Sequence, residues 1–379
     1  ASRRGDLDIA QQYGERALAL DPLDPPGAAG MARTRIEQRR PEQALVVLDK
    51  VLATDLRDEN LANLASLKGE ALDRLGRFAE AFAAYSVSNE ATSRRLDRLG
   101  TGSETHRDFA ERLGREFAAI NDWPTDETDE SPAPAFLIGY PRSGTTLVEN
   151  VLASIPGVAA LEERPTLAAG DHYLRKAGLA RLAKADRDTL DDLRKAYWQA
   201  VAAAGIDAVG KLFVDKDPLK GLYLPLIARM FPNAKIIVMR RDPRDVVWSC
   251  FRANFAPTPA AAEFTGLERA ARHYDTLMRS QEAFLEALTL SRHELPYEAL
   301  VADFDEETKR LCNFLGVEWT EQMRDFARTA RRRGVSTMSA SQVSKPLYDG
   351  SRQWQRYDEQ LGPILPILAP WVERFGYAA

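Results

Sequence analysis

Apolar positions follow two different patterns along this 379-residue chain, and the change between them divides it in two. The first 95 residues or so are rich in alanine, leucine and charge, and their small and apolar residues recur at helical spacing. Farther along, the apolar positions form short continuous runs, such as "AFLIG" from Ala135 and "KIIVM" from Lys235. Runs of this length predict strands buried in a parallel sheet. We therefore expect an all-α part followed by an α/β part.

The helical part carries an internal repeat. Ala10, Ala44 and Ala81 take equivalent places, spaced 34 and then 37 residues apart, and Ala17 and Val51 follow the first two by seven residues. Seven residues are two helical turns along one face. This pattern resembles the tetratricopeptide repeat, in which small residues let two antiparallel helices approach closely. The resemblance implies about three repeats, the first without its leading helix.

The repeat pattern also predicts where helices end and where the domains divide. Pro22 should end the second helix of the first repeat, since proline cannot continue it. Gly69 and Gly76 fit the first helix and the turn of the last repeat. An acidic, proline-containing stretch, "NDWPTDETDESPAP", reads as a linker. We expect domains at residues 1–95 (tetratricopeptide, TPR), 96–134 (helix and linker) and 135–379. An ordinary helical bundle is the alternative for the first region.

The stretch "GYPRSGTTLVEN" from Gly139 has the architecture of a phosphate-binding loop. It joins a predicted strand to a predicted helix, and Gly139 and Gly144 have the G-x-x-x-x-G spacing of a nucleotide-binding P-loop. Thr145 stands where that motif has its lysine, and Arg142 lies inside the loop. Unpaired backbone N–H groups at a helix start favour an oxyanion. We therefore expect an anion site that does not hold a triphosphate in the usual way.

A second strand-to-helix corner follows in "NAKIIVMRRDPRDVVWSCFRANF". Arg241 comes at the end of the predicted strand, and Asp242 and Pro243 suit the first positions of a helix. Ser249 lies eight residues after Arg241. A strand-end arginine and a helix serine can grip one anion from two sides.

Together, "YPRSGTT" and "RRDPRDVVWS" resemble the sulfotransferases that depend on 3′-phosphoadenosine 5′-phosphosulfate (PAPS). This resemblance implies an α/β P-loop-type sulfotransferase domain, with a parallel sheet flanked by helices, preceded by an all-α TPR solenoid. It implies PAPS as donor, 3′-phosphoadenosine 5′-phosphate (PAP) as product, and no metal. PAPS has no γ-phosphate, which explains the missing lysine. The implied 5′-phosphosulfate site comprises Arg142, Ser143, Gly144, Thr145 and Thr146; the implied 3′-phosphate site comprises Arg241 and Ser249.

The finer resemblance is to tyrosylprotein sulfotransferases and to bacterial proteins that join TPR repeats to a sulfotransferase domain. "LEERPTL" implies that Glu163 is the catalytic general base, and "VDKDPLK" implies that Lys216 assists transfer by stabilising the bridging oxygen. Arg142 is implied to contact the sulfuryl group or the 5′-phosphate. His172 is the rival base, because small-molecule sulfotransferases use histidine, although its position does not match their pattern.

Three further nucleotide contacts are implied nearer the C-terminus. Tyr297 resembles a strand-end tyrosine near the nucleotide, although a core tyrosine is the alternative. The segment "SASQVSKPLYDGSRQW" resembles the part that closes over the nucleotide, with Ser339 and Arg352 as its contacts.

Composition limits the remaining possibilities. A formal net charge of −5 and a pI of about 5.7 argue against a general nucleic-acid binder. The four histidines are scattered and form no metal motif, and Cys250 and Cys312 suit buried thiols. No apolar run approaches the ~20 residues that span a bilayer. With few cysteines and no visible export segment, we expect a cytoplasmic location.

The sequence leaves the acceptor open. A glutamate base and an attached repeat module favour a tyrosine in a peptide or protein, which the TPR repeats would hold. A carbohydrate, lipid or small metabolite is the alternative acceptor, with the repeats serving assembly, and a homodimer is one possible assembly. An inactive TPR scaffold with a vestigial nucleotide domain is a third reading. Thr145 in place of lysine argues against a P-loop kinase.

Overall fold

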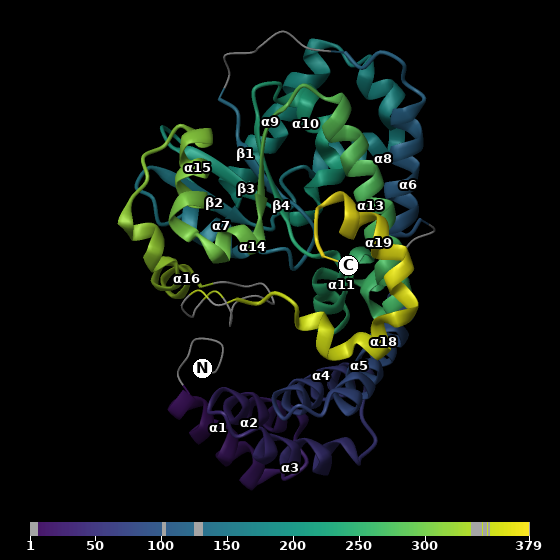
Figure 1. Ribbon diagram of the computed structural model, residues 1–379, viewed down its shortest axis with the longest axis vertical. Helices are drawn as coiled ribbons and strands as arrows, with labels where there is room; N and C mark the ends of the chain where they lie inside the picture. Colours follow the sequence, from purple (N-terminus) through teal and green to yellow (C-terminus); the bar gives the residue numbers. More distant parts are fainter. Residues whose placement is uncertain are drawn as a thin grey trace. The chain divides into compact units, whose positions relative to one another are not determined.

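The computed structural model describes residues 7–100, 104–124, 132–334, 343, 347 and 349–378, and its packing forms two compact units (Figure 1). The first unit combines Ala1–His106, Pro243–His273 and Arg352–Ala379; the second combines Arg107–Asp242 and Tyr274–Ser351. The domain boundaries at residues 95 and 134 stay a prediction, since a compact unit can draw on segments of more than one domain.

A five-stranded sheet, entirely parallel, organises the second unit. Its strands are β1 (Ala135–Ile138), β2 (Val158–Glu162), β3 (Leu212–Lys216), β4 (Lys235–Arg240) and β5 (Ser291–Pro296), in the order β2-β3-β1-β4-β5. The apolar runs predicted to be buried strands are β1 and most of β4. Because β1 lies between β3 and β4, the order of strands changes direction beside it, and the carboxyl edge there is where α/β proteins bind ligands.

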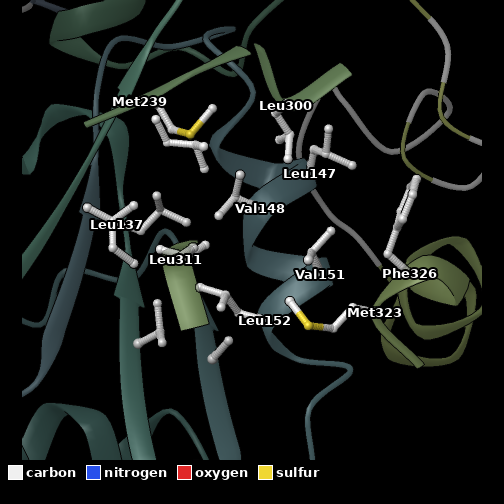
Figure 2. Packing of buried hydrophobic residues seen from close by; sticks show 14 of the residues in the cluster. Leu137, Leu147, Val148, Val151, Leu152, Met239, Leu300, Leu311, Met323 and Phe326 are labelled. Carbon is white, nitrogen blue, oxygen red and sulfur yellow. The ribbon is translucent and has the colours of Figure 1, made fainter. Parts of the chain in front are cut away.

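Helices cover both faces of this sheet, so its central strands β1, β3 and β4 are largely buried. On one face, Leu137 and Met239 pack with Leu147 and Val151 of α7 (Thr145–Leu152) in a single buried cluster (Figure 2). On the other face, Phe136 packs against Tyr197. The parallel sheet flanked by helices is therefore confirmed.

The other helices of this unit connect the strands or extend the sheet's cover. They are α6 (His106–Ala118), α8 (Ala168–Ala183), α9 (Arg187–Ala203), η2 (Pro218–Tyr223), α10 (Leu224–Met230), α13 (Leu267–Ala287), α14 (Tyr297–Ala302), α15 (Phe304–Leu315), η4 (Glu321–Asp325) and α16 (Phe326–Arg333). Helices α6 and α13 each begin in the first unit. The loop after β1 and the loop after β4 lead into α7 and α11 (Pro243–Phe251), which gives the two strand-to-helix corners expected.

Five helices form the repeat region of the first unit: α1 (Leu7–Leu20), α2 (Pro25–Glu37), α3 (Pro41–Leu52), α4 (Asp58–Arg74) and α5 (Phe78–Leu99). The equivalent alanines Ala10, Ala44 and Ala81 are all buried, as close helix packing requires. A Cβ on Gly69 would lie 2.5 Å from the ring of Tyr85, so α4 and α5 approach closely there. Helix α1 ends before Pro22, as predicted.

The last repeat helix, α5, packs against α11 in the core of the first unit. Phe82 of α5 stacks on Trp248 and Phe251 of α11, and the Asn89 amide donates to the Phe251 carbonyl at 2.7 Å. The other elements of this unit are α12 (Pro259–Ala262), η3 (Glu263–Thr265), η5 (Gln353–Tyr357), α18 (Asp358–Leu361), η6 (Gly362–Ile364) and α19 (Leu365–Arg374). The helix that carries Ser249 is thus packed on the repeats.

Both cysteines are buried, as the sequence predicts. Within the described ranges, no helix has the length and apolar character required to cross a bilayer.

Candidate active site

Hydrogen bonds tie three loops together at the carboxyl edge of the sheet. The Gly139 N–H donates to the Pro218 carbonyl at 3.2 Å, which joins the loop after β1 to the segment after β3. The Glu163 N–H donates to the Lys216 carbonyl at 2.8 Å, and the strand register pairs Glu162 with Lys216. Parallel register therefore brings residues from three separate motifs of the sequence to one edge.

The loop after β1 has the conformation of an anion cradle. Arg142 and Gly144 have positive φ angles of 74° and 106°, and Gly144 caps the N-terminus of α7. Ser143, Thr145 and Thr146 are buried. Among the atoms of the described residues, the Ser143 Oγ has no hydrogen-bond partner although it is buried. A buried hydroxyl without a partner costs free energy, which a bound oxyanion would recover.

We predict that Gly144→Ala destabilises the protein by about 1–3 kcal/mol, because a residue with a side chain would be held there in a left-handed backbone conformation. Its Cβ would also lie 2.9 Å from the Tyr297 ring. Gly157→Ala is the matched control: Gly157 has φ 82° but nothing within 4 Å of an added Cβ. Chemical denaturation should find Gly144→Ala the less stable of the two. Equal losses would show that the contact with Tyr297 does not matter.

Arg241, which follows β4, contacts the loop after β1. Its Nη1 donates to the Arg142 carbonyl at 2.9 Å, and its Nη2 donates to the Gly350 carbonyl at 2.7 Å. Its guanidinium lies 4.5 Å from the centroid of the Tyr297 ring, which supports it by a cation–π contact. The Arg241 Nε is buried with no hydrogen-bond partner in the described part of the chain. Arg142, Arg241 and Tyr297, predicted from separate motifs, therefore lie together.

Lys216 and Glu163 form an ion pair at the same edge. Lys216 ends β3 and its ammonium is fully buried, at 2.7 Å from the Glu163 Oε1 and 3.4 Å from the Thr146 Oγ1. The Glu163 side chain is 40% exposed, so its carboxylate can reach an incoming molecule. Glu163 also has a positive φ of 43°, a strained conformation of the kind found at functional sites.

Three further charged residues lie around this pair, and of these the sequence analysis missed Glu149 and Arg333. Glu149 of α7 and Glu162 lie 3.4 and 3.9 Å from the Lys216 ammonium, and Arg333 lies 2.8 Å from Glu149. Glu149 occurs three residues after Thr146, on the same face of α7, and that spacing was the available signal. Arg333 is distant in sequence and carries no motif.

The pKa values of Lys216 and Glu149 are set by their burial and by the charged groups around them. Burial of Lys216 lowers its pKa, but Glu149, Glu163 and Glu162 raise it by more, so the net shift is upward. Burial raises the pKa of Glu149, against the opposing effects of Lys216 and Arg333. Lys216 is consequently an ammonium at neutral pH. The site offers a charged donor, a partly exposed carboxylate and an anion cradle at one edge.

The remaining predicted site residues are Ser249, Arg352, Ser339 and the rival base His172. Ser249 on α11 and Arg352, at the start of η5, belong to the first compact unit. The Arg352 N–H donates to Asp245 of α11 at 2.6 Å. Ser339 lies outside the described residues. His172 is exposed on α8. The pairing of Arg241 with Ser249 therefore stays a prediction from sequence.

The fold and this edge define an α/β protein of the P-loop type with a candidate anion site at the carboxyl edge of its sheet. The model of the sulfotransferase family matches residues 134–321, and that of the tetratricopeptide repeat matches residues 1–68. A putative protein-tyrosine sulfotransferase of Caenorhabditis elegans is 31% identical over 203 residues, which are 50% of this chain and 74% of that protein. The chain belongs to the sulfotransferase family, with N-terminal tetratricopeptide repeats, as the sequence motifs predict.

Two further similarities extend the comparison. An uncharacterized protein of Aquifex aeolicus is 26% identical over 96% of this chain, and the chain spans 48% of that relative's length. Among solved structures, the sulfotransferase domain from the Synechococcus PCC 7002 olefin synthase is similar at 21% identity and a TM-score of 0.46, covering 68% of this chain and 100% of that chain.

Proposed function

We propose that this protein transfers a sulfuryl group from PAPS to an acceptor hydroxyl, with a tyrosine of a peptide or protein as the most suitable acceptor. The observation that carries the proposal is the 2.7 Å pair of Lys216 and Glu163 beside the phosphate loop. Transfer needs a cation where charge develops and a base for the acceptor proton, and this pair supplies both.

Two buried donor atoms without a hydrogen-bond partner fit an adenosine bisphosphate that carries a sulfuryl group. The Ser143 Oγ and the Arg241 Nε are buried donors with no partner among the described residues. Ser143, with Arg142, Thr145 and Thr146, would hold the 5′-phosphosulfate. Arg241, with Ser249 as predicted from sequence, would hold the 3′-phosphate. These donors suit the donor nucleotide without requiring a metal ligand set.

In the proposed reaction, Glu163 takes the proton of the acceptor hydroxyl while the acceptor oxygen bonds to sulfur. Lys216 stabilises the charge that develops on the bridging oxygen as the bond between sulfur and the 5′-phosphate breaks. PAPS supplies the activated sulfuryl group, and PAP leaves. A phenol with a pKa of ~10 needs such a base at neutral pH. Arg142 holds charge on the transferring group or on the 5′-phosphate.

The exposure of Glu163 and the activities of relatives both bear on the nature of the acceptor. A partly exposed glutamate base suits a hydroxyl presented on a bulky chain, and protein-tyrosine sulfotransferases occur among the relatives. TPR repeats bind peptides or proteins in other molecules, which supports a peptide or protein substrate. A carbohydrate, lipid or small metabolite is the alternative acceptor.

A transfer assay with labelled PAPS distinguishes these acceptors. We expect label to reach tyrosine peptides, and their phenylalanine counterparts to remain unlabelled. Label in a glycan, lipid or metabolite fraction alone would favour the alternative acceptor. No label in any fraction, with no PAP formed, would support an inactive scaffold.

Arg241→Ala is expected to weaken PAP binding by about 10- to 100-fold, the worth of hydrogen bonds to a charged group. Adenosine 5′-phosphate should lose far less affinity, because it has no 3′-phosphate. Calorimetric titration of both nucleotides measures the difference. An equal loss for the two nucleotides would contradict the 3′-phosphate role.

A further inference from the structure

The buried ammonium of Lys216 has two close carboxylates that differ in character. Glu163, in the segment after β2, is 40% exposed, whereas Glu149 on α7 is 1% exposed. The first can meet an acceptor and the second cannot. Glu162, at 3.9 Å from the ammonium, is a more distant third.

Arg333 fixes the buried carboxylate from the other side. Its Nη2 lies 2.8 Å from the Glu149 Oε1 and donates to the Ala160 carbonyl at 2.9 Å, while its Nη1 donates to the Asn150 Oδ1 at 3.3 Å. The Glu149 Oε2 is then the oxygen that faces Lys216. Glu149 therefore bridges two cations, and α16 is tied to both α7 and β2 through one guanidinium.

The proposed reaction makes this second carboxylate necessary. Once Glu163 has accepted the acceptor proton, it is neutral and can no longer balance the Lys216 charge. An ammonium left in that buried place without a counter-charge would tend to lose its proton. A neutral amine could not stabilise the bridging oxygen. Of the carboxylates that remain near the ammonium, Glu149 at 3.4 Å is closer than Glu162 at 3.9 Å, so Glu149 supplies the larger share of the balancing charge.

We propose that Glu149 is a positioning residue, oriented by Arg333. It keeps the Lys216 ammonium charged and in place while Glu163 takes the acceptor proton and loses its own negative charge. This inference rests on the proposed function of Glu163 and Lys216. It assigns a role to a carboxylate that touches neither donor nor acceptor, and it makes α16 part of the support of the site.

The charged surroundings of Lys216 agree with this assignment. Asp215, its neighbour on β3, is occupied by Lys220 at 2.5 Å, so it is not available to replace Glu149. Burial raises the pKa of Asp217, the other neighbour. Among the described residues, the charged groups around the ammonium are Glu149 on α7 and, behind it, Arg333 on α16. Glu162 ends β2 and Glu163 follows it, and Asp215 lies on β3 and Asp217 just after it.

The test uses Glu163→Gln as a neutral stand-in for the protonated base. Titration of the Lys216 side chain by ¹⁵N NMR, assigned with Lys216→Arg, follows its charge without donor or acceptor. We expect Lys216 to stay charged at neutral pH in Glu163→Gln, and its pKa to fall by at least about one further unit in Glu163→Gln/Glu149→Gln. Equal Lys216 pKa values in the single and double variants would overturn the inference.

Turnover gives a second readout. In Glu149→Gln, the alkaline limb of kcat should move to lower pH, since Lys216 loses its proton more readily, and Glu149→Asp should restore it in part. The matched control is Glu307→Gln, which removes a buried carboxylate paired with Arg310. A wild-type pH profile in Glu149→Gln would count against the role.

Arg333→Gln is the variant to use if Glu149→Gln does not fold, because the Arg333 side chain is 27% exposed and the Glu149 side chain only 1%. It should lower kcat at neutral pH, by less than Glu149→Gln does, because Glu149 loses the group that orients it, and Arg333→Lys should restore kcat in part. A wild-type kcat in Arg333→Gln would contradict the inference. Failure of the proposed function would look different: the wild-type protein would neither bind PAP nor transfer label, whereas the NMR titration would still report on Glu149.

Discussion

Glu163→Gln is expected to lower turnover by about 10²- to 10⁴-fold, the usual contribution of a positioned general base. Glutamine keeps the size of the side chain but cannot accept the acceptor proton. PAP affinity should change by less than a few-fold, because the Lys216 ammonium retains Glu149 at 3.4 Å and the phosphate loop is untouched. The loss should therefore appear in kcat and not in the affinity for the nucleotide.

Steady-state kinetics with labelled PAPS, together with calorimetry of PAP, measure this split. Glu307→Gln is the control, since it neutralises a buried glutamate of the same compact unit on α15. It should leave turnover within a few-fold of the wild type. Unchanged turnover in Glu163→Gln would remove Glu163 from the mechanism, and His172 would become the candidate to examine.

Lys216→Met is expected to lower turnover by about 10²- to 10³-fold, which is typical for removing one group that stabilises developing charge. It should also lower the free energy of unfolding by about 3–5 kcal/mol, because it removes one of the two cations that the buried Glu149 carboxylate contacts. Lys220→Met is the matched control, since Lys220 is a buried lysine paired with Asp215 in the adjoining segment. It should cost similar stability but much less turnover.

The stability loss of Lys216→Met should grow as the pH rises from 5 to 8. The folded-state pKa of Glu149 is already raised by burial, and removal of Lys216 raises it further, whereas an unfolded glutamate has a pKa near ~4.3. A group whose folded pKa is raised stabilises the fold below its unfolded value and loses that contribution as the pH rises through its folded value. Denaturation at several pH values measures the trend. A loss independent of pH would show that the carboxylates are not left uncompensated.

Local sequence patterns could predict the parts of this molecule whose structure depends on residues close together in the sequence. The apolar runs at Ala135 and Lys235, the glycines of the phosphate loop, and the alanines of the repeats each specify local geometry, and the fold follows from them. The carboxyl edge of a parallel sheet then gathers Arg142, Glu163 and Lys216, because the ends of neighbouring strands meet there.

The parts that could not be predicted depend on long-range packing. Arg333 reaches Glu149 across 184 residues of sequence, and no local pattern marks Arg333 as a partner of that carboxylate. The packing of α5 on α11 was also not evident, because it depends on how aromatic residues such as Phe82 and Trp248 meet in space. Such contacts follow from the fold once it is known.

The most direct test of the central claim is a calorimetric titration of the wild-type protein with PAP and, separately, with ATP and Mg²⁺. The lysine-less loop and the two orphaned donors predict one PAP site and much weaker binding of ATP. Binding of ATP with Mg²⁺ that is tighter than that of PAP, or no binding of PAP, would contradict the assignment of a PAPS-dependent sulfotransferase site.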